Sequence, residues 1–154
     1  MKKQRYDTDK IVRIMIDENQ YSFGRTLMKP YVAFYDYKTN EKQANIGEII
    51  TKPIMFILCI YDYVITKGRW EIVADVPNSA IDVAIPLQFL QDAFPPYSCS
   101  LIDAQGNSIS ASIGECRRLE RCAVWEPEHV EERIKDFYDG KKNIWAESLK
   151  LKEE

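Results

Sequence analysis

The residues of this chain best suited to covalent chemistry are its single histidine and its four cysteines. A thiol beside an imidazole becomes a nucleophile, so Cys116 or Cys122 paired with His129 would make a small cysteine-dependent hydrolase or transferase. However, His129 falls in the first turn of a predicted helix, where histidines more often cap the helix or face solvent. The cysteines also lack the short paired spacings of a tetrahedral zinc site. We therefore expect no catalytic residue, no metal site and no cofactor.

Two Gly-Arg pairs interrupt apolar runs, one in YSFGRTL (21–27) and one in ITKGRW (65–70). A phosphate-binding loop needs several glycines directly before a helix, so that main-chain N–H groups converge on the anion, and neither pair has that context. Gly24 lies within a run, where glycine usually marks a β-bulge or a close backbone contact. Gly68 fits the end of a short helix. Both glycines are therefore predicted to be structural.

The arginines of these two pairs are predicted to tie strands together. Strict alternation places Arg25 on the same face as apolar side chains, where a guanidinium must reach solvent or find a carboxylate. The candidate partners are the carboxylates beside apolar runs, namely Asp36, Asp62 and Glu120. We expect Arg25 and Arg69 each to bind a carboxylate or main-chain carbonyl groups in a bidentate manner.

The segment EPEHVEERIKDFYD, residues 126–139, is rich in acidic side chains. The simpler interpretation is a solvated helix face with some pairing between residues four apart. The functional interpretation is a negative surface for a basic protein partner, which would speed association and set specificity. In that second interpretation the contact residues are Glu126, Glu128, Glu131, Glu132 and Asp136.

Composition and charge argue against several classes of protein. The net charge of −3 disfavours a nucleic-acid binder, which usually presents a basic face. An aromatic content of 12% disfavours a disordered chain. The longest apolar stretch, 53–61, is much shorter than the roughly 20 residues that span a bilayer, and no targeting segment is apparent. The scattered cysteines indicate reduced thiols. We expect a cytoplasmic protein with no nucleic-acid or membrane partner.

Apolar alternation with β-branched and aromatic residues predicts about seven strands. The polar connections 17–20 and 104–107 have the length of hairpin loops. The predicted strands are 11–16, 21–27, 31–37, 53–60, 69–76, 98–103 and 108–113. We also expect one or two helical turns in 61–68, a short helical turn within 77–96, and a further strand in 115–125.

The segment EPEHVEERIKDFYDG predicts the best-defined helix of the chain. Pro127 suits its first turn and Gly140 suits its end. Apolar residues at helical spacing form one stripe along it, namely Val130, Ile134, Phe137 and Tyr138. A second helix or a docked tail is expected over 143–151.

Together these elements predict an α+β fold, because strands come first and helices gather towards the C-terminal end. We expect a bent antiparallel sheet or partial β-barrel of about seven strands, with the C-terminal helix packed on its open side. Strands do not alternate with helices, which argues against a doubly wound sheet. The chain is predicted to be a single domain, 1–154, with a core at 10–140 and a helical tail at 141–154.

The order of three segments resembles the bacterial immunity protein 26 family. These segments are YSFGRTL, PYVAFYDY and PIMFILCIYDYVITKGRWEIVADVP, and the most specific motif is KGRW followed by a strand that ends at a proline. The segment LERCAVWEPEHVEERIKDFYDG is also similar to the C-terminal part of related chains. The resemblance covers roughly residues 10–150, whereas the start of the chain and the TNEKQANIGEII stretch depart from the family pattern.

The resemblance implies binding rather than catalysis. Members of this family are small cytosolic proteins that neutralise a polymorphic toxin, often a nuclease, by covering or distorting its active region. Their contact residues are not set by a motif, so the resemblance gives no binding residue. The positions that match the family pattern are Gly24, Arg25, Asp36, Gly68, Arg69 and Trp70, which we interpret as structural.

We therefore expect a non-enzymatic immunity protein that binds one cognate toxin. The alternatives are the small cysteine-dependent hydrolase or transferase described above and a ligand-binding β-barrel. A barrel of that kind would enclose a sizeable apolar cavity. The sequence leaves the oligomeric state open.

Overall fold

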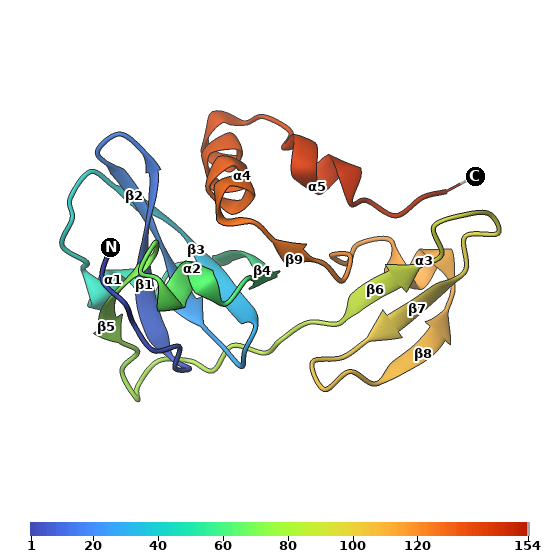
Figure 1. Cartoon of the computed structure of the whole chain (residues 1–154), viewed down its shortest axis with the longest axis horizontal. Coiled ribbons are helices and arrows are strands. Elements are labelled where there is room, and N and C mark those ends of the chain that lie inside the picture. The colour runs from blue at the N-terminus through green and yellow to red at the C-terminus, as the bar shows by residue number, and fades with distance from the viewer. Residues whose placement is uncertain (154) are drawn as a thin grey trace.

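Residues 10–39 fold into three antiparallel strands because apolar and β-branched side chains alternate along them. The structure, a computed structural model, describes residues 1–153 (Figure 1). The strands are β1 (Lys10–Asp17), β2 (Gln20–Thr26) and β3 (Tyr31–Thr39). Asn19 turns the chain between the first two with a φ of 53°, a left-handed conformation that asparagine tolerates. The hairpin predicted from 11–16 and 21–27 is confirmed.

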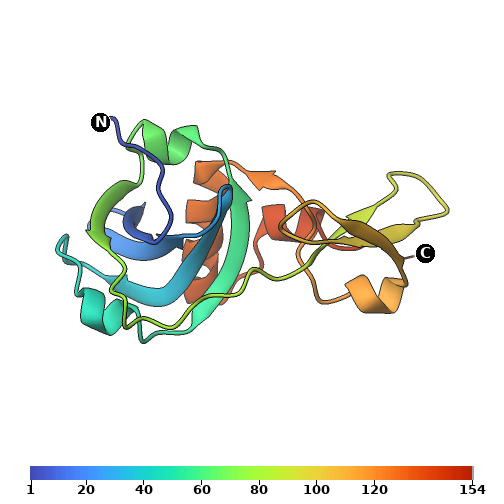
Figure 2. The same cartoon turned by 90° about the horizontal axis from the view of Figure 1, so that it is seen from below.

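Three further strands extend this unit into a six-stranded sheet. They are β4 (Ile54–Ile60), β5 (Glu71–Asp75) and β9 (Val124–Trp125). The spatial order is β5-β1-β2-β3-β4-β9, and only the pairing of β4 with β9 is parallel. The sheet curls strongly, as Figure 2 shows. The predicted α+β fold with a bent, mainly antiparallel sheet is confirmed, and within residues 1–153 the sheet does not close into a barrel.

Helices flank this sheet at several points. They are α1 (Ile46–Ile49), α2 (Tyr63–Thr66), α4 (Pro127–Asp139) and α5 (Ile144–Ser148). The predicted ends of the longest helix are confirmed, since α4 begins at Pro127 and is capped by Gly140 with a φ of 68°. Among the described residues, no helix has the length and apolar character needed to cross a membrane.

A second sheet of three strands lies beside the first (Figure 1). It contains β6 (Gln88–Gln91), β7 (Cys99–Ile102) and β8 (Ser108–Ala111), and it is followed by α3 (Ile113–Cys116). The predicted hairpin of 98–103 and 108–113 corresponds to β7 and β8. Residues 76–87 form a long connection without regular secondary structure between the two sheets, as Figures 1 and 2 show. We call these residues the connector.

The expectation of a helical turn within 77–96 is wrong. The structure has strand β6 there, and its four residues pair with β7 in antiparallel register. Phe89 pairs with Leu101 and is only 1% exposed, so the burial of one aromatic side chain favours the extended form. Prolines on both sides of the segment also restrict the growth of a helix.

The expectation of a continuous strand over 115–125 is also wrong. Helix α3 begins at a capping box, in which the side chains of Ser112 and Glu115 each accept a hydrogen bond from the other residue's main-chain N–H. The chain then passes through turns and bends, and only the two residues of β9 pair with the first sheet. Residues 120–122 form only an isolated bridge with Phe89 of β6, so the apolar content of the segment reflects side-chain burial more than strand pairing.

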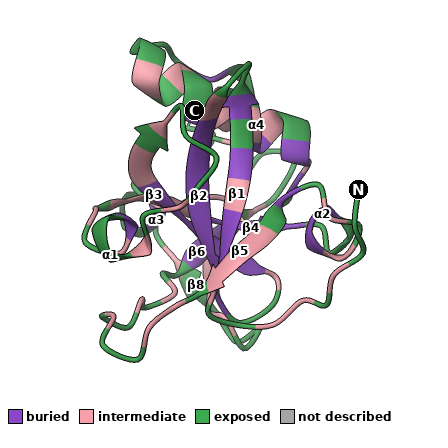
Figure 3. Ribbon diagram, turned by 90° about the vertical axis from the view of Figure 1, so that its left-hand side faces the viewer, coloured by how far each residue is buried: buried purple, intermediate pink, exposed green. Residues whose placement is uncertain are grey.

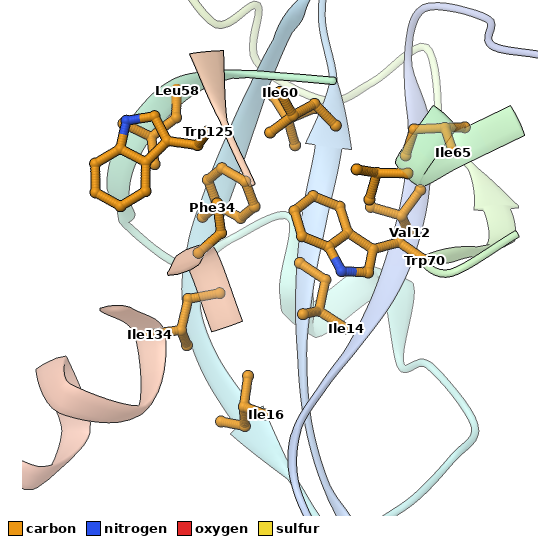
Figure 4. Packing of buried hydrophobic residues seen from close by; sticks show 13 residues of the cluster. Val12, Ile14, Ile16, Phe34, Leu58, Ile60, Ile65, Trp70, Trp125 and Ile134 are labelled. Atoms are coloured by element: carbon orange, nitrogen blue, oxygen red, sulfur yellow. The ribbon is translucent and has the colours of Figure 1, made fainter. Parts of the chain in front are cut away.

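The main hydrophobic core lies between the six-stranded sheet and α4 (Figure 4). Trp70 has no exposed surface, and its ring meets Phe34 edge-on with the two centroids 5.6 Å apart. Trp125 of β9 and Val130 and Ile134 of α4 belong to the same cluster. Elements from the last third of the chain therefore complete a core that the first strands begin.

The opposite face of the sheet is covered as well. Ile11, Phe23 and Tyr35 pack there with Ile49 of α1, and the connector packs against a third cluster through Val83 and its neighbours. Figure 3 shows β2 and neighbouring parts of the sheet buried along most of their length. Because side chains fill both faces of this open sheet, residues 1–153 offer no support for the alternative of a ligand-binding barrel.

A larger residue would collide with the backbone at Gly68 and would be tightly packed at Gly24. Gly68 follows α2 with a φ of 81°, and a Cβ atom there would lie 2.0 Å from the main-chain oxygen of Lys2. At Gly24 a Cβ atom would lie 3.0 Å from Val32 Cγ1, and the register between β2 and β3 shifts next to this glycine. Gly68 therefore brings two segments of backbone unusually close together, whereas Gly24 makes room for the side chain of Val32.

We predict that Gly68→Ala lowers the free energy of unfolding more than Gly106→Ala does. Both glycines have a positive φ, which costs an alanine about 1–2 kcal/mol. Nothing lies within 4 Å of a Cβ atom built at Gly106, whereas at Gly68 the methyl group collides with the backbone of Lys2. Urea unfolding of both variants measures the difference, and equal losses would contradict the close-approach role of Gly68.

Candidate functional site

Glu131 of α4 is the polar centre of the contact between this helix and the sheet. Arg69 Nε and Nη2 donate to its two carboxylate oxygens at 2.9 and 2.8 Å. The indole Nε1 of Trp70 donates to Glu131 Oε2 at 2.9 Å. Because Trp70 is completely buried, Glu131 is the acceptor that its N–H group requires. Arg69 thus binds a carboxylate in a bidentate manner, as predicted. The carboxylate belongs to helix α4, however, so Arg69 ties the helix to the sheet rather than one strand to another.

Two more acidic residues lie on the same side of α4. Glu128 Oε1 is 3.1 Å from Arg69 Nη1, and the hydroxyl of Tyr63 donates to Glu126 Oε2 at 2.8 Å. This hydrogen bond is the main cause that raises the pKa of Tyr63 to about 12. Tyr63 also stacks on Tyr61 with the ring centroids 5.9 Å apart. A pair of aromatic rings therefore borders the acidic residues.

Glu132 and Asp136 contact α5 and its N-cap instead. Trp145 Nε1 donates to Glu132 Oε2 at 2.8 Å, and Asn143 Nδ2 donates to Asp136 Oδ2 at 3.0 Å. The ring of His129 stacks on Trp145 with the centroids 3.6 Å apart and the planes at 13°. These contacts hold α5 against α4.

Each acidic residue that we predicted as a toxin contact therefore has a partner within the chain. These residues are Glu126, Glu128, Glu131, Glu132 and Asp136. Only two of them share a cation, Arg69, and the other three bind neutral donors, so the surface keeps a negative charge. Glu128 and Glu132 are exposed, and the others are half-buried.

Exposed aromatic side chains, which the sequence analysis did not place, lie beside these carboxylates. Tyr61 and Tyr63 are 41% and 39% exposed, and Trp145 is 36% exposed. A hollow of about 260 Å³ between β9, α4 and α5 is lined in part by Val124 and Trp145. We call the combined surface the acidic-aromatic face, which consists of Tyr61, Tyr63, Val124, Glu126, Glu128, Glu132 and Trp145.

Arg25 binds a carboxylate that we did not predict. Its Nε and Nη2 atoms lie 3.1 and 3.0 Å from Asp9 Oδ1. Its Nη1 donates to the main-chain oxygen of Ile81, in the connector, at 2.8 Å. Arg25 is only 4% exposed, so these contacts serve a buried guanidinium. Arg25 therefore links β2 to the N-terminal segment and to the connector.

The carboxylates that we expected to pair with Arg25 lie elsewhere, so those three expectations are wrong. Asp62 Oδ2 lies 3.0 Å from Lys29 Nζ, with which it forms an ion pair. Glu120 accepts two hydrogen bonds from Arg133, each of 2.9 Å. Asp36 of β3 lies near Tyr138, where burial first and the Asp36 carboxylate second raise the pKa of the phenol.

The described residues do not join His129 to a cysteine by a hydrogen bond. The His129 ring is stacked on Trp145, whereas Cys116 is buried in α3 beside the second sheet. Burial raises the pKa of the Cys116 thiol and also that of Cys59, and a raised pKa weakens a thiol as a nucleophile. Within residues 1–153, no three His, Cys, Asp or Glu side chains gather as a metal site would require.

Comparison with known protein families gives a match over more than half of the chain. The family described as immunity protein 26 matches residues 10–100, from the start of β1 into β7. This range includes both Gly-Arg pairs and the KGRW segment. No curated protein and no solved structure matches the chain.

We predict that Glu131→Ala lowers the free energy of unfolding by about 2–3 kcal/mol. The substitution leaves the buried indole N–H of Trp70 without an acceptor, a loss that typically costs about 1–3 kcal/mol, and it also removes the partner of Arg69. Urea unfolding monitored by tryptophan fluorescence measures this change. Glu131→Gln keeps an acceptor oxygen and should lose less than the alanine variant.

Glu128→Ala is the matched control for this substitution. It also removes a carboxylate that pairs with Arg69, but this carboxylate is exposed and accepts no hydrogen bond from a buried donor. An exposed pair of this kind contributes about 0.5 kcal/mol or less. If the two alanine variants lost the same stability, Glu131 would not be the acceptor that holds α4 to the sheet.

We further predict that Cys59 and Cys116 react slowly with a thiol reagent in the native chain. Burial raises the pKa of both thiols, so the thiolate fraction at pH 7.5 is lower than in the unfolded chain, and access is restricted. Alkylation with iodoacetamide followed by mass spectrometry gives the rate at each cysteine. A single fast cysteine whose rate falls in His129→Ala would instead favour the cysteine-dependent enzyme.

Proposed function

Since the chain belongs to the immunity protein 26 family, we propose that it is a non-enzymatic protein that binds and neutralises one cognate polymorphic toxin. The observation that carries this proposal is the family match over residues 10–100. Neutralisation of this kind needs only protein–protein contact that covers or distorts the active region of the toxin. It requires no nucleophile, base, metal or cofactor from the immunity protein.

We assign toxin binding to the acidic-aromatic face. Tyrosine and tryptophan are common anchors of protein interfaces, and exposed carboxylates attract a basic partner and orient it. A nuclease is the toxin class that suits this face best. The surface of a nuclease that holds phosphate groups must be basic, and it is therefore complementary to a negative surface.

The five acidic residues predicted from the sequence remain our proposed contact residues, but we expect them to contribute to toxin binding in different ways. They are Glu126, Glu128, Glu131, Glu132 and Asp136. Glu128 and Glu132 are the exposed members, so we place the direct ion pairs to the toxin there. Glu131 contributes mainly by holding α4 in place, because both of its oxygens already accept hydrogen bonds from the chain.

We also propose that residues 1–154 act as one domain in the cytoplasm, with neither nucleic acid nor membrane as a partner. Support for one domain comes from Trp125, Val130 and Ile134, which complete the core of strands that precede them by about 60 residues or more. Support for a reducing compartment comes from the cysteines, all four of which are free thiols.

The function is tested by finding the partner and measuring protection against it. The tagged chain is used to recover a partner from its native cell, and that partner is identified by mass spectrometry. Its C-terminal domain is then expressed in a host cell with and without this chain. We expect loss of growth with the domain alone and restored growth when the chain is present. Recovered growth that is lost when Cys122 is changed to serine would contradict a purely binding function.

We predict that the double variant Glu128→Lys with Glu132→Lys binds the purified toxin at least about tenfold more weakly than the unchanged chain. Reversal of two exposed charges repels a basic partner, and the effect falls mainly on the association rate and shrinks in high salt. Surface plasmon resonance at low and high salt measures both properties.

The control for this variant is Glu41→Lys with Asp82→Lys. Both residues are exposed and lie outside α4, so the net charge changes by the same amount at another place. Its affinity should stay within about twofold of the unchanged chain. If the two double variants weakened binding equally, the affinity would depend only on the net charge of the chain. That result would contradict the assignment of toxin binding to the acidic-aromatic face.

A further inference from the structure

Residues 149–153 leave α5 and run beside the three-stranded sheet without regular secondary structure (Figure 1). We call these residues the terminal segment. The side-chain amide of Gln91, in β6, binds the main chain of Lys152 in both directions. Its Nε2 donates to the carbonyl oxygen at 2.8 Å, and its Oε1 accepts from the N–H group at 2.9 Å. One side chain therefore satisfies both main-chain groups of an extended residue.

Two arginines bind the same segment. Arg121 Nε donates to the carbonyl oxygen of Leu149 at 2.9 Å, and its Nη2 donates to that of Lys150 at 3.2 Å. Arg117 Nη2 lies 2.6 Å from the carboxylate of Glu153. The sites for main-chain groups and for the acidic side chain thus follow one another along the segment, with the carboxylate at its end.

Arg121 is held in position by Phe89 of β6. Its guanidinium lies over the ring of Phe89 at 4.8 Å, and Phe89 is buried. The residues on either side of Arg121 form main-chain hydrogen bonds with Phe89, at 3.0 Å from Glu120 and 2.8 Å from Cys122. Gln91 and Arg121 therefore project from the edge of the second sheet, whereas Arg117 and Arg118 lie in the turn that follows α3.

The packing around the terminal segment is loose. A cavity of about 380 Å³ lies between this segment and the arginine-rich stretch 117–121. A second cavity, also of about 380 Å³, is lined by Lys152 and Glu153 together with Tyr97 and its neighbours. Leu149 packs against the main core, whereas residues 150–153 are held mainly by polar contacts and have hollows beside them. Segments with few packed apolar contacts open locally at low free-energy cost.

We propose that Gln91, Arg117, Arg118 and Arg121 form a binding groove for an extended acidic peptide of a partner protein, and that the terminal segment occupies this groove as a displaceable internal ligand. An incoming peptide takes over the main-chain hydrogen bonds of Lys152 and the carboxylate contact of Glu153. The proposal does not depend on the acidic-aromatic face or on the identity of the toxin.

The charges of the groove favour an acidic ligand. The partners of Arg121 are neutral oxygens, and Arg118 forms no ion pair among the described residues. Arg117 is compensated only by Glu153, which belongs to the terminal segment itself. When the segment leaves, three guanidinium groups lack a carboxylate in a chain whose net charge is −3. A carboxylate-bearing ligand would therefore be attracted to this place.

The geometry favours a peptide over a nucleic acid. The amide of Gln91 offers one donor and one acceptor, which complement the C=O and N–H groups of one extended residue. A phosphodiester backbone has acceptors but no donor, so it could not replace the N–H group of Lys152, and the acceptor oxygen of Gln91 would keep only its hydrogen bond from Arg121 Nη2 at 3.2 Å. Arg117 holds the carboxylate of Glu153 through two N–H groups, and because a guanidinium binds phosphate in the same way, the preference for a peptide rests on Gln91.

The test uses a fluorescein-labelled peptide of the sequence SLKLKEE, residues 148–154, and fluorescence polarisation. A chain shortened to residues 1–149 keeps Leu149 packed on the core but frees the sites of Lys150, Lys152 and Glu153, and it should bind the peptide with a dissociation constant in the micromolar range. The unchanged chain should bind it at least about tenfold more weakly, because its own segment competes at a high effective concentration. Equal affinity of the two chains would overturn the proposal.

Point variants make the test independent of the truncation. In the unchanged chain, Glu153→Lys should weaken the internal contact with Arg117 and restore peptide binding towards that of the shortened chain. In the shortened chain, Arg117→Gln should lower the affinity at least about tenfold. Arg5→Gln is the matched control, since Arg5 is an exposed arginine that pairs with Asp7 and should leave binding unchanged. A loss in the control equal to that in Arg117→Gln would contradict the assignment.

Two competitors define the ligand class. The peptide SLKLKQQ, which lacks the carboxylates, should bind at least about tenfold more weakly than SLKLKEE. A short single-stranded oligonucleotide should compete less well than unlabelled SLKLKEE at the same concentration. Tighter binding by the oligonucleotide would assign the groove to nucleic acid instead, and equal binding of the two peptides would exclude recognition of the carboxylate.

Discussion

The fold depends on the need to bury a tryptophan whose indole N–H must still find an acceptor. Trp70 fills the space between the bent sheet and α4, and it has no exposed surface. Glu131 supplies the acceptor from the helix and binds Arg69 with the same carboxylate. An unpaired donor at this depth is costly, so α4 is fixed in both position and rotation along its axis. The turn at Gly68 places Arg69 and Trp70, and the start of α4 at Pro127 places Glu131, so that these three side chains meet.

That constraint also determines what the surface of α4 presents. Because Glu131 faces Arg69, Glu128 is placed at the exposed rim of the same arginine. On the other side, Glu132 and Asp136 hold α5 through Trp145 and Asn143. Acidic residues that appear as one charged run in the sequence thus divide into structural and exposed members. Aromatic side chains gather around them because the same hydrogen bonds fix Tyr63 and Trp145.

Local patterns in the sequence predicted strands β1 to β5, the hairpins and α4, because alternation, Pro127 and Gly140 act over short distances. They did not predict Asp9 as the partner of Arg25, since that contact depends on how the N-terminal segment and the connector cross β2. Strand β6 was missed because its pairing partner is β7 and its own residues carry little pattern. The aromatic part of the candidate site was missed because exposure of Tyr61 and Trp145 is set by tertiary packing.

The position of α4 late in the sequence has a consequence for synthesis on the ribosome. The strands that carry Val12, Phe34 and Trp70 are made first, but the helix that covers them follows only after residue 126. At about 5–20 residues per second, the nascent chain carries an uncovered apolar sheet face for several seconds. During that interval it is exposed to aggregation and to chaperones. The arrival of α4 is therefore the step that covers this apolar face.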